Sequence, residues 1–387
     1  MPRLHTFALA AACLMAAPNL ASAQTKDTTK AAASSKDKKE KKDKKDKKDA
    51  PPVDTTLGAP ILPPKVPKLS PLFQAETPLA VTFMTNMKQL KRDRGEKAPY
   101  HPATFTYADS SGAKVVVPVR ARTRGIWRLK NCDFPPVRIK VSDKEVKGTL
   151  FHSIGEPKMV NFCHSTETYE QYILQEFMLY RVYQVLTPVS SHVRLLKVAY
   201  ADSASGKVEN TRYGFFAEDP DQVAARNGGT VVKQKGATAD DLDPRQSAIA
   251  FIFQYMIGNT DFSFGGLHNS NLIRTTTGEI LPVAYDFDYA GAVNTSYAVP
   301  DPQLRIKNVR DRQFRGYCAF KDEYIKALDL FKTRKDAIYA LYTDPVGQLL
   351  SPRSVKDAIS YFDDFYKQIQ TPRQAQREIF DECVKTN

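Results

Sequence analysis

Beyond its first 23 residues, this chain of 387 residues lacks any apolar run long enough to cross a bilayer. It also lacks a CxxC pair or any other His and Cys spacing typical of a zinc site, and it contains no internal repeat. The sequence also has no motif in which basic and aromatic residues are interleaved, so nothing in it indicates a nucleic-acid partner. These absences argue against an integral membrane protein, a zinc protein and a repeat protein.

Cysteine is scarce, with five residues in all. Cys13 lies in the N-terminal apolar run, and the residues before it make a poor lipoprotein signal, so we expect no lipid there. The other four allow three disulfide pairings in an oxidising compartment. We favour Cys132–Cys163 and Cys318–Cys383, and free buried thiols are the alternative.

The N-terminus, Met1 to Ala23, has the pattern of a secretory signal. Arg3 supplies the positive end, Phe7 to Ala17 the apolar run, and Ala21-Ser22-Ala23 the small-residue cleavage site. We therefore expect cleavage after Ala23 and a mature protein exported to the periplasm or the cell exterior.

Residues 24–71 have the composition of a disordered linker. Gln24 to Ala50 repeats a Lys-Lys-Asp pattern with almost no apolar residues and cannot bury a core. Ala50 to Pro71 is Pro-rich and semi-extended. The Lys-rich tail is most simply a solvated spacer, and contact with an anionic envelope polymer is the alternative.

The folded part begins near Leu72 and leaves enough chain for one large domain or two lobes. Patterns typical of strands occur at 79–84, 103–107, 114–123, 137–141, 158–163, 193–200 and 212–217. Within one of them Arg120, Arg122 and Arg124 alternate with small or apolar residues, so we expect all three cations on one face.

The clearest helix is expected over Thr166 to Leu186, with Ser165 or Thr166 as its cap. Glu176 lies on or beside its apolar stripe, where it either faces the core and needs a partner or reaches solvent at the edge. Further helices are expected over 221–226, 244–258, 321–342 and 354–384, the last interrupted near Pro372.

The stretch Gly258 to Gly291 places six polar groups between apolar runs. They are Asp261, His268, Asn269, Asn271, Asp286 and Asp288. Singly, such residues usually mark turns and caps. As a set, they predict two loops that present carboxylate and amide oxygens, which Mg²⁺ and similar hard cations bind in phosphoryl transfer.

The order of elements matches that of the protein-kinase lobes: strands, a loop with glycine, a strand with Lys158, a helix with Glu176, two strands, then helices carrying two acidic loops. The literal His-Arg-Asp, Asp-Phe-Gly and GxGxxG motifs are absent. We expect an α+β, atypical protein-kinase-like two-lobed fold. Its β-rich N-terminal lobe would span about 72–218 and its mainly helical C-terminal lobe about 219–387.

The motifs Asn259-Thr260-Asp261, His268-Asn269 and Tyr285-Asp286-Phe287-Asp288 with Gly291 resemble the spore coat protein H (CotH) kinase family. These are atypical kinases related to secretory-pathway kinases, and the resemblance runs from about Arg124 to Cys318. It implies that Asp261 is the catalytic Asp and that Asn269 and Asp286 ligate the metal. Asp288 would bind a second metal or support the first. We expect His268 to be structural, since a lone His is more often a hydrogen-bonded loop residue than a catalyst.

In the N-terminal lobe, the element order assigns Lys158 to the nucleotide phosphates and Glu176 as its partner. Lys140 is the rival lysine, and Arg124 is a candidate phosphate contact. Asp261 and Asn269 are farther apart than in the kinase motif H-R-D-x-x-x-x-N, which leaves Asn271 as an alternative ligand.

The resemblance implies an exported kinase that uses ATP with Mg²⁺ or Mn²⁺ to phosphorylate Ser or Thr hydroxyls of envelope or secreted proteins. The first alternative is a pseudokinase or another nucleotide-dependent transferase, because exported bacterial proteins meet little ATP. The second is a non-catalytic surface assembly protein whose acidic loops hold a structural Ca²⁺. A glycosidase fits poorly, because nothing marks a separate acid with a raised pKa.

Overall fold

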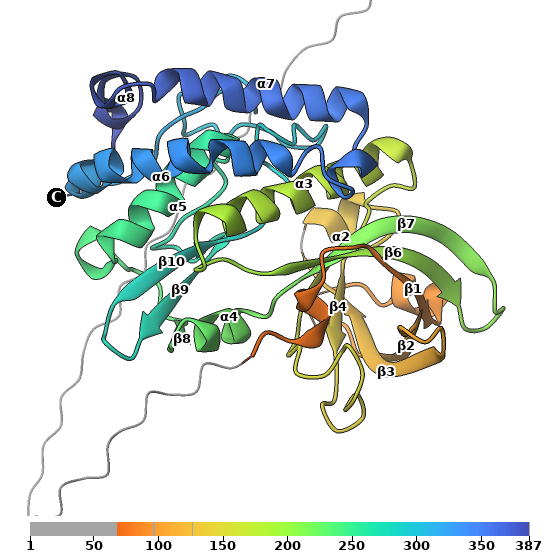
Figure 1. Cartoon of the computed structure of the whole chain (residues 1–387). Coiled ribbons are helices and arrows are strands. Elements are labelled where there is room, and N and C mark those ends of the chain that lie inside the picture. The colour runs from red at the N-terminus through yellow and green to blue at the C-terminus, as the bar shows by residue number, and fades with distance from the viewer. Residues whose placement is uncertain (1–67, 96, 126, 387) are drawn as a thin grey trace, which may run out of the picture. The chain divides into compact units, whose positions relative to one another are not determined.

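The computed structural model describes residues 68–95, 97–125 and 127–386 (Figure 1). The expected signal peptide and nearly all of the expected linker lie outside the described residues. Among the described helices, none combines the length and the apolar character needed to span a bilayer. The described part is a mixed α+β structure with a closed β-barrel in its N-terminal part and a helical C-terminal region.

The expected strands and helices occur in the expected order with shifted ends, and α1, α2 and β8 are additional elements that were not expected. The strands are β1 (Leu79–Thr85), β2 (His101–Ala108), β3 (Lys114–Thr123), β4 (Val137–Lys140), β5 (Lys158–Val160), β6 (Val193–Asp202), β7 (Val208–Ala217), β8 (Gly229–Val232), β9 (Ser270–Thr275) and β10 (Ile280–Ala284). The helices are α1 (Met87–Arg92), α2 (Trp127–Asn131), α3 (Glu167–Leu186), α4 (Pro220–Arg226), α5 (Pro244–Ile257), α6 (Lys321–Ala340), α7 (Pro352–Gln368) and α8 (Pro372–Glu378).

Seven strands close the barrel in the order β1-β2-β3-β4-β5-β7-β6. Neighbours are antiparallel except β1 and β6, whose parallel pairing closes the ring. Strand β3 alternates as expected: Val119, Ala121 and Thr123 are buried, while Arg120 is exposed. Arg120 and Arg122 therefore alternate with the buried face as predicted, whereas Arg124 lies beyond the end of β3 and lines a cavity.

The barrel interior is filled largely by aromatic rings. Phe105 lies at its centre, with ring centroids 5.0 Å from Phe83, 5.3 Å from Phe151 and 5.6 Å from Phe216. All four side chains are fully buried. Each such side chain contributes about 2–3 kcal/mol by burial, so a barrel of short strands still has a substantial core.

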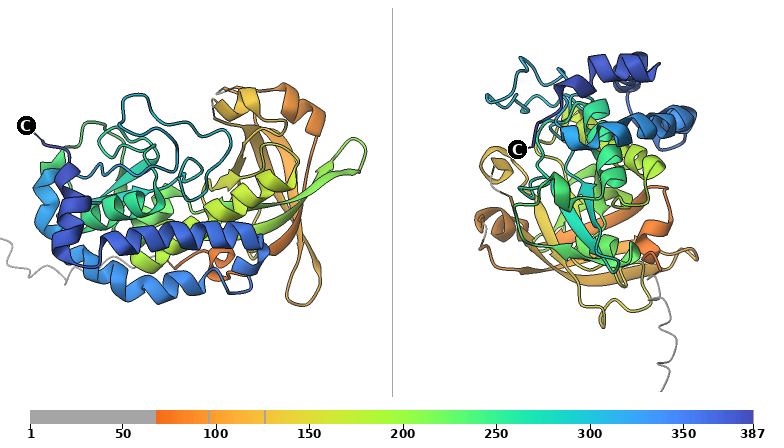
Figure 2. Two further views of the ribbon diagram at one scale, coloured as in Figure 1. Left: turned by 90° about the horizontal axis from the view of Figure 1, so that it is seen from above. Right: turned by 90° about the vertical axis from the view of Figure 1, so that its left-hand side faces the viewer.

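The helical region surrounds α5, which is apolar on nearly every face and buried along most of its length. Asp243 caps its first turn, Pro244 occupies the first helical position, and Gly258 ends it in the left-handed conformation. Helix α5 packs against α6, α7 and strand β10. Figures 1 and 2 show α3, α6 and α7 running alongside one another, with the barrel at one end of this layer.

A second, three-stranded sheet has the order β10-β9-β8. Strands β9 and β10 form a hairpin, and the two predicted acidic loops lie immediately before β9 and immediately after β10. This sheet was not foreseen, although its apolar runs were predicted to be buried. It matters for the site because antiparallel pairing brings the start of β9 beside the end of β10.

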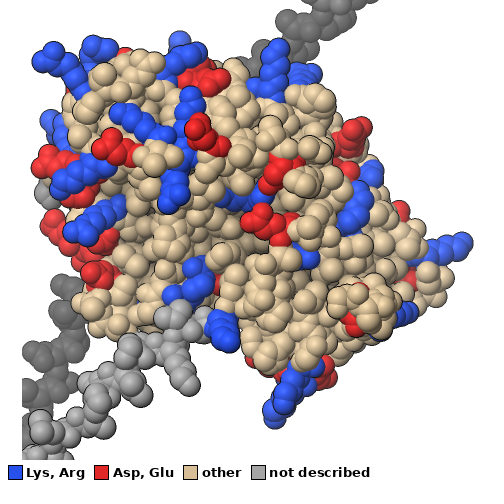
Figure 3. Space-filling model, viewed as in Figure 1, with Lys and Arg blue, Asp and Glu red and all other residues tan. Residues whose placement is uncertain are grey.

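Both predicted disulfides are confirmed, Cys132–Cys163 and Cys318–Cys383. Disulfides are typical of proteins in oxidising compartments. The predicted strand 158–163 is shorter than expected and ends at Val160, and the break near Pro372 falls where expected, between α7 and α8. Figure 3 shows that Lys and Arg are interspersed with Asp and Glu on one face of the molecule.

Candidate functional site

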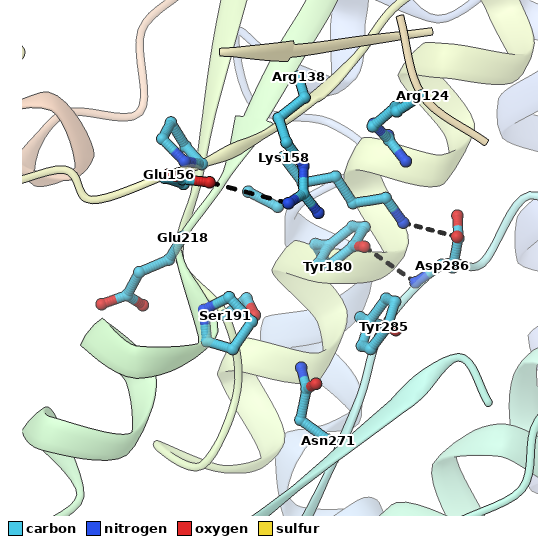
Figure 4. Close-up of a pocket in the computed structure, with 13 residues that line it drawn as sticks. Arg124, Arg138, Glu156, Lys158, Tyr180, Ser191, Glu218, Asn271, Tyr285 and Asp286 are labelled. Atoms are coloured by element: carbon cyan, nitrogen blue, oxygen red, sulfur yellow. Dashed lines mark hydrogen bonds and ion pairs between the residues drawn. The ribbon is translucent and has the colours of Figure 1, made fainter. Parts of the chain in front are cut away.

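A cavity of about 230 Å³ lies where the barrel meets the helical region. Its walls come from separate elements: Lys158 from β5, Tyr180 from α3, Asn271 from β9 and Asp286 from the loop after β10. Figure 4 shows Lys158, Tyr285 and Asp286 pointing toward one another across it. The fold therefore gathers residues more than a hundred positions apart.

Lys158 and Asp286 form the central contact of the cavity. The Lys158 Nζ lies 2.5 Å from Asp286 Oδ2 and 4.8 Å from the centroid of the Tyr285 ring. Burial opposes the charge on Asp286, yet Lys158, Arg124 and Arg128 together hold the pKa of that carboxyl below its ordinary value. Asp286 is thus an anion at neutral pH.

The backbone at Asp286 is held in a left-handed conformation, with φ of +65°, which non-glycine residues seldom adopt. Its N–H donates to the Tyr180 hydroxyl oxygen at 2.9 Å. Helix α3 therefore fixes the backbone of the loop that presents the carboxylate. Such local strain is typical of functional sites.

Glu176 does not reach solvent, so the alternative that placed it at an exposed helix edge is wrong. It is 1% exposed, and its Oε1 has no hydrogen-bond partner within the described residues. Burial raises the pKa of Glu176 well above its ordinary value, with Asp288 and Asp286 adding to the effect. The structure pairs Lys158 with Asp286, and the expected Lys158–Glu176 contact is not made.

Asp261 is held by its own loop. His268 Nε2 lies 2.8 Å from Asp261 Oδ1, and the Asn269 amide donates to the Asp261 backbone oxygen at 2.8 Å and to Oδ2 at 2.9 Å. The Asp261 N–H donates to Asn259 Oδ1 at 3.0 Å. The carboxylate is therefore oriented from both oxygens while remaining 37% exposed.

The backbone around Asp261 is held by hydrogen bonds from Arg315 and from the second acidic loop. Arg315 donates to the carbonyl oxygens of Thr260 and Phe262, on either side of Asp261. The Gly291 N–H donates to the Gly258 oxygen at 3.0 Å. The Tyr285 N–H donates to the backbone carbonyl oxygen of Asn269 at 3.1 Å. The two loops consequently behave as one unit.

Asp288 is half-buried, and its Oδ2 accepts a hydrogen bond from the Tyr297 hydroxyl at 3.1 Å. Burial, with the nearby Asp286 carboxylate, raises the pKa of Asp288 to about 6. Its charge state therefore changes just below neutral pH, where a bound cation would favour the ionised form.

The residues present suit a hard divalent cation, with oxygen as the donor throughout. The amide nitrogen of Asn269 is used by Asp261, which leaves its Oδ1 free of that contact and able to accept a ligand. Within the described chain no group of three or more His, Cys, Asp or Glu could hold an ion unaided. Mg²⁺ commonly uses one or two carboxylates and completes its shell with water and substrate phosphates.

The structure also separates the rival candidates. Lys140 lies on the outer barrel surface, 54% exposed and 3.6 Å from Glu156 Oε1, whereas Lys158 points into the cavity. Asn269 is bonded to Asp261, whereas Asn271 lines the cavity. The cavity lining favours Lys158 over Lys140, whereas Asn269 and Asn271 both stay candidate ligands.

Arg124 lines the cavity and donates to the Met159 oxygen at 3.3 Å. Two further cations, Arg128 and Arg138, were not predicted. Arg128 lies near the start of α2 and acts electrostatically on Glu176, Asp286 and Asp288. Its position shortly after Gly125, in a stretch rich in charged residues, was the signal that could have indicated Arg128.

No protein-family model matches the chain, and comparison with curated proteins also finds no match. A cavity with cations on one wall and carboxylates on another can hold a polyanion together with a divalent cation. An oriented, accessible carboxylate lies on the adjoining loop.

Proposed function

We propose that the protein is an exported atypical kinase related to the CotH family, which transfers the γ-phosphate of ATP to Ser or Thr hydroxyls of proteins. Lys158 and Arg124 bind the nucleotide phosphates, and Asp261 orients the acceptor hydroxyl. The barrel and the helical region are the two lobes of a kinase-like fold. The two disulfides support export to an oxidising compartment.

The observation that carries the proposal is the contact between Lys158 and Asp286 across the cavity, 2.5 Å long. A lysine of the barrel and an aspartate of the helical region have no structural need to meet at an open cavity. Phosphoryl transfer needs that combination, because a cation must neutralise phosphate oxygens beside the carboxylate that binds the metal.

In the transfer step the acceptor oxygen attacks the γ-phosphorus, and the bond to the β,γ-bridging oxygen breaks. ADP leaves, and the hydroxyl proton passes to the carboxylate of Asp261. His268 and Asn269 hold that carboxylate in place, so that positioning contributes more than basicity. Lys158 and Arg124 stabilise the charge that develops on the phosphate oxygens.

A Mg²⁺ or Mn²⁺ ion held by Asp286 and Asn269, with Asp288 behind them, would supply neutralisation of the phosphate charge. Since these oxygens belong to one hydrogen-bonded unit, metal and nucleotide should bind together. Nucleotide affinity should therefore depend on the metal.

The test is transfer of label from γ-labelled ATP to protein in the presence of Mg²⁺ or Mn²⁺, with a panel of secreted and envelope proteins as acceptors. The variant Asp261→Asn keeps the shape of the side chain and should lose transfer by at least about 100-fold. It should still bind ATP. Equal transfer by Asp261→Asn and the wild type would contradict the role of Asp261.

A second candidate, a nucleotide-binding protein with altered chemistry, is favoured by one observation. Glu176 is buried without a hydrogen-bond partner for Oε1 in the described chain, and it does not engage Lys158. ATP labelled on the base or the α-phosphate separates the two functions. Appearance of that label on the acceptor protein indicates transfer of the nucleotide instead of the γ-phosphate. Binding without any transfer indicates a pseudokinase.

A non-catalytic metal-stabilised assembly protein predicts a different response to ligands. Ca²⁺ alone would raise the melting temperature, and ATP would add nothing. The kinase predicts that ATP and Mg²⁺ together raise it more than either alone, because a ligand specific for the folded state stabilises it.

A further inference from the structure

Five cations project from the outer side of the barrel wall formed by β3, β4 and β5, and the last of them, Lys158, points into the cavity and pairs with Asp286. Arg120 lies directly opposite Lys140, and Arg122 directly opposite Arg138, in the pairing of β3 with β4. Arg138 in turn lies opposite Lys158 in the pairing of β4 with β5. Residues directly opposite in antiparallel strands point to the same face. These five side chains are called the cationic row below.

Like charges placed directly opposite one another destabilise a sheet. Arg138 and Lys140 share the carboxylate of Glu156, at 3.7 and 3.6 Å, and remain 47% and 54% exposed. Half-exposed ion pairs of this kind contribute little to stability, and the single negative charge of Glu156 cannot neutralise both cations. A surface built only for solubility would intersperse the signs instead.

The row joins two hollows. At one end Arg138 and Lys158 line the cavity of the candidate site (Figure 4). At the other, Arg120 and Lys140 line a shallower hollow of about 520 Å³ on the barrel surface. Arg138 and Lys140 are two residues apart on β4, about 7 Å along the strand. The cations therefore form a continuous track from one hollow to the other.

We propose that the cationic row binds a linear polymer carrying phosphate groups, which lies along β3 and β4 from the cavity to the second hollow. Three of the five cations are arginines, whose planar guanidinium groups bind phosphate through paired hydrogen bonds. A nucleotide held at Lys158 and Arg124 does not account for Arg120 and Lys140 at the far end. This surface goes beyond the proposed kinase function and does not depend on it.

The test measures binding of inorganic polyphosphate of defined length to the full chain as a function of salt. The double variant Arg120→Gln/Lys140→Gln should weaken binding about tenfold or more. It should also reduce the slope of log K against log salt by about 2, because each lost phosphate contact releases fewer counterions. Binding of ATP with Mg²⁺ should be unchanged.

The matched control is Arg353→Gln/Lys356→Gln on α7, where Arg353 is 92% exposed and Lys356 is also exposed. This control removes the same charge away from the row and should leave polyphosphate affinity within about twofold of the wild type. Equal losses in the two double variants would overturn the proposal, since binding would then reflect net charge alone. Polyglutamate of equal charge that bound as tightly would overturn the assignment to phosphate.

Discussion

At the scale of single residues, Asp286 combines an anionic side chain, a left-handed backbone and a direct contact with Lys158. Asp286→Asn should reduce metal-dependent nucleotide turnover by at least about 100-fold, because a neutral amide binds a divalent cation poorly and cannot offset Lys158. Asn tolerates a positive φ, so the thermal unfolding curve should change little.

The control for this substitution is Asp364→Asn on α7, where the aspartate is 59% exposed and pairs only with its neighbour Lys367 among the described residues. Turnover should be the same as in the wild type. Full activity of Asp286→Asn would show that the carboxylate holds no essential metal.

Asp288 makes stability depend on pH in the absence of metal. Its pKa is about 6 in the folded protein against about 3.9 in an unfolded chain. The folded state therefore binds the extra proton between those values, and the free energy of unfolding should fall as pH rises from about 4 to about 6. Asp288→Asn should remove this part of the slope.

Urea denaturation at several pH values with a chelator present measures that slope directly. Glu176 contributes a slope of the same sign. The contribution of Asp288 is therefore the difference between the slopes of the wild type and of Asp288→Asn. An identical pH dependence in the wild type and Asp288→Asn would show that Asp288 does not titrate in this range.

Part of the site could be predicted at this scale and part could not. Asp261, Asn269 and Asp286 could be singled out because polar residues packed between apolar runs have few structural uses, and their roles stay predictions. The lack of a hydrogen-bond partner for Glu176 Oε1 among the described residues could not be predicted, because it depends on how α3 approaches the acidic loops. The spacing of residues in the sequence does not give the distance between a helix and a loop in the folded chain.

At the scale of elements, the end of α5 controls the placement of Asp261. Gly258 has a φ of +65°, and a Cβ added there would meet the Tyr361 hydroxyl. Gly258→Ala should destabilise the protein by about 2 kcal/mol or more, from the left-handed backbone and the clash together. It should also displace the loop that carries Asp261 and lower activity.

The background Tyr361→Phe provides the comparison, because it removes the hydroxyl that the added Cβ would meet. In that background Gly258→Ala should cost less, because the worst clash is gone; the backbone contribution of about 1–2 kcal/mol remains, together with tight contacts to ring carbons Cζ and Cε1 at 3.0 and 3.3 Å. Chemical denaturation of all four proteins gives the coupling. A coupling of zero would show that the contact with Tyr361 is not what excludes a side chain at this position.

The elements themselves were largely predictable, since β3, α3 and α5 have the alternation, caps and breakers that define them. Their pairing was not. Closure of the barrel depends on β1 running parallel to β6, more than a hundred residues away. The hairpin of β9 and β10 depends on a turn between two short apolar runs that also resemble buried helix segments.

At the scale of the whole molecule, the disulfide Cys318–Cys383 closes a loop of 65 residues around α6 and α7. Removing it with Cys318→Ser/Cys383→Ser should lower the free energy of unfolding by about 2–5 kcal/mol, because the unfolded chain gains freedom. Denaturation of the oxidised wild type and the double variant measures the loss. An unchanged midpoint would show that packing alone holds the C-terminal helices.

The two pairings were predictable because four cysteines allow few combinations and the favoured pairs are near in sequence. The relative position of the barrel and the helices was expected only through element order and the family resemblance. The contact between Lys158 and Asp286 supports that order physically, since it joins the two regions at one cavity.

The central claim is that this cavity binds a nucleoside triphosphate together with a divalent cation. Calorimetric titration of ATP into the wild type and Lys158→Met, with Mg²⁺ or with a chelator, tests it most directly. The account predicts one ATP bound per chain with Mg²⁺ present, and at least about tenfold weaker binding with the chelator or in Lys158→Met. ATP that bound equally well to both proteins, or to neither, would contradict it.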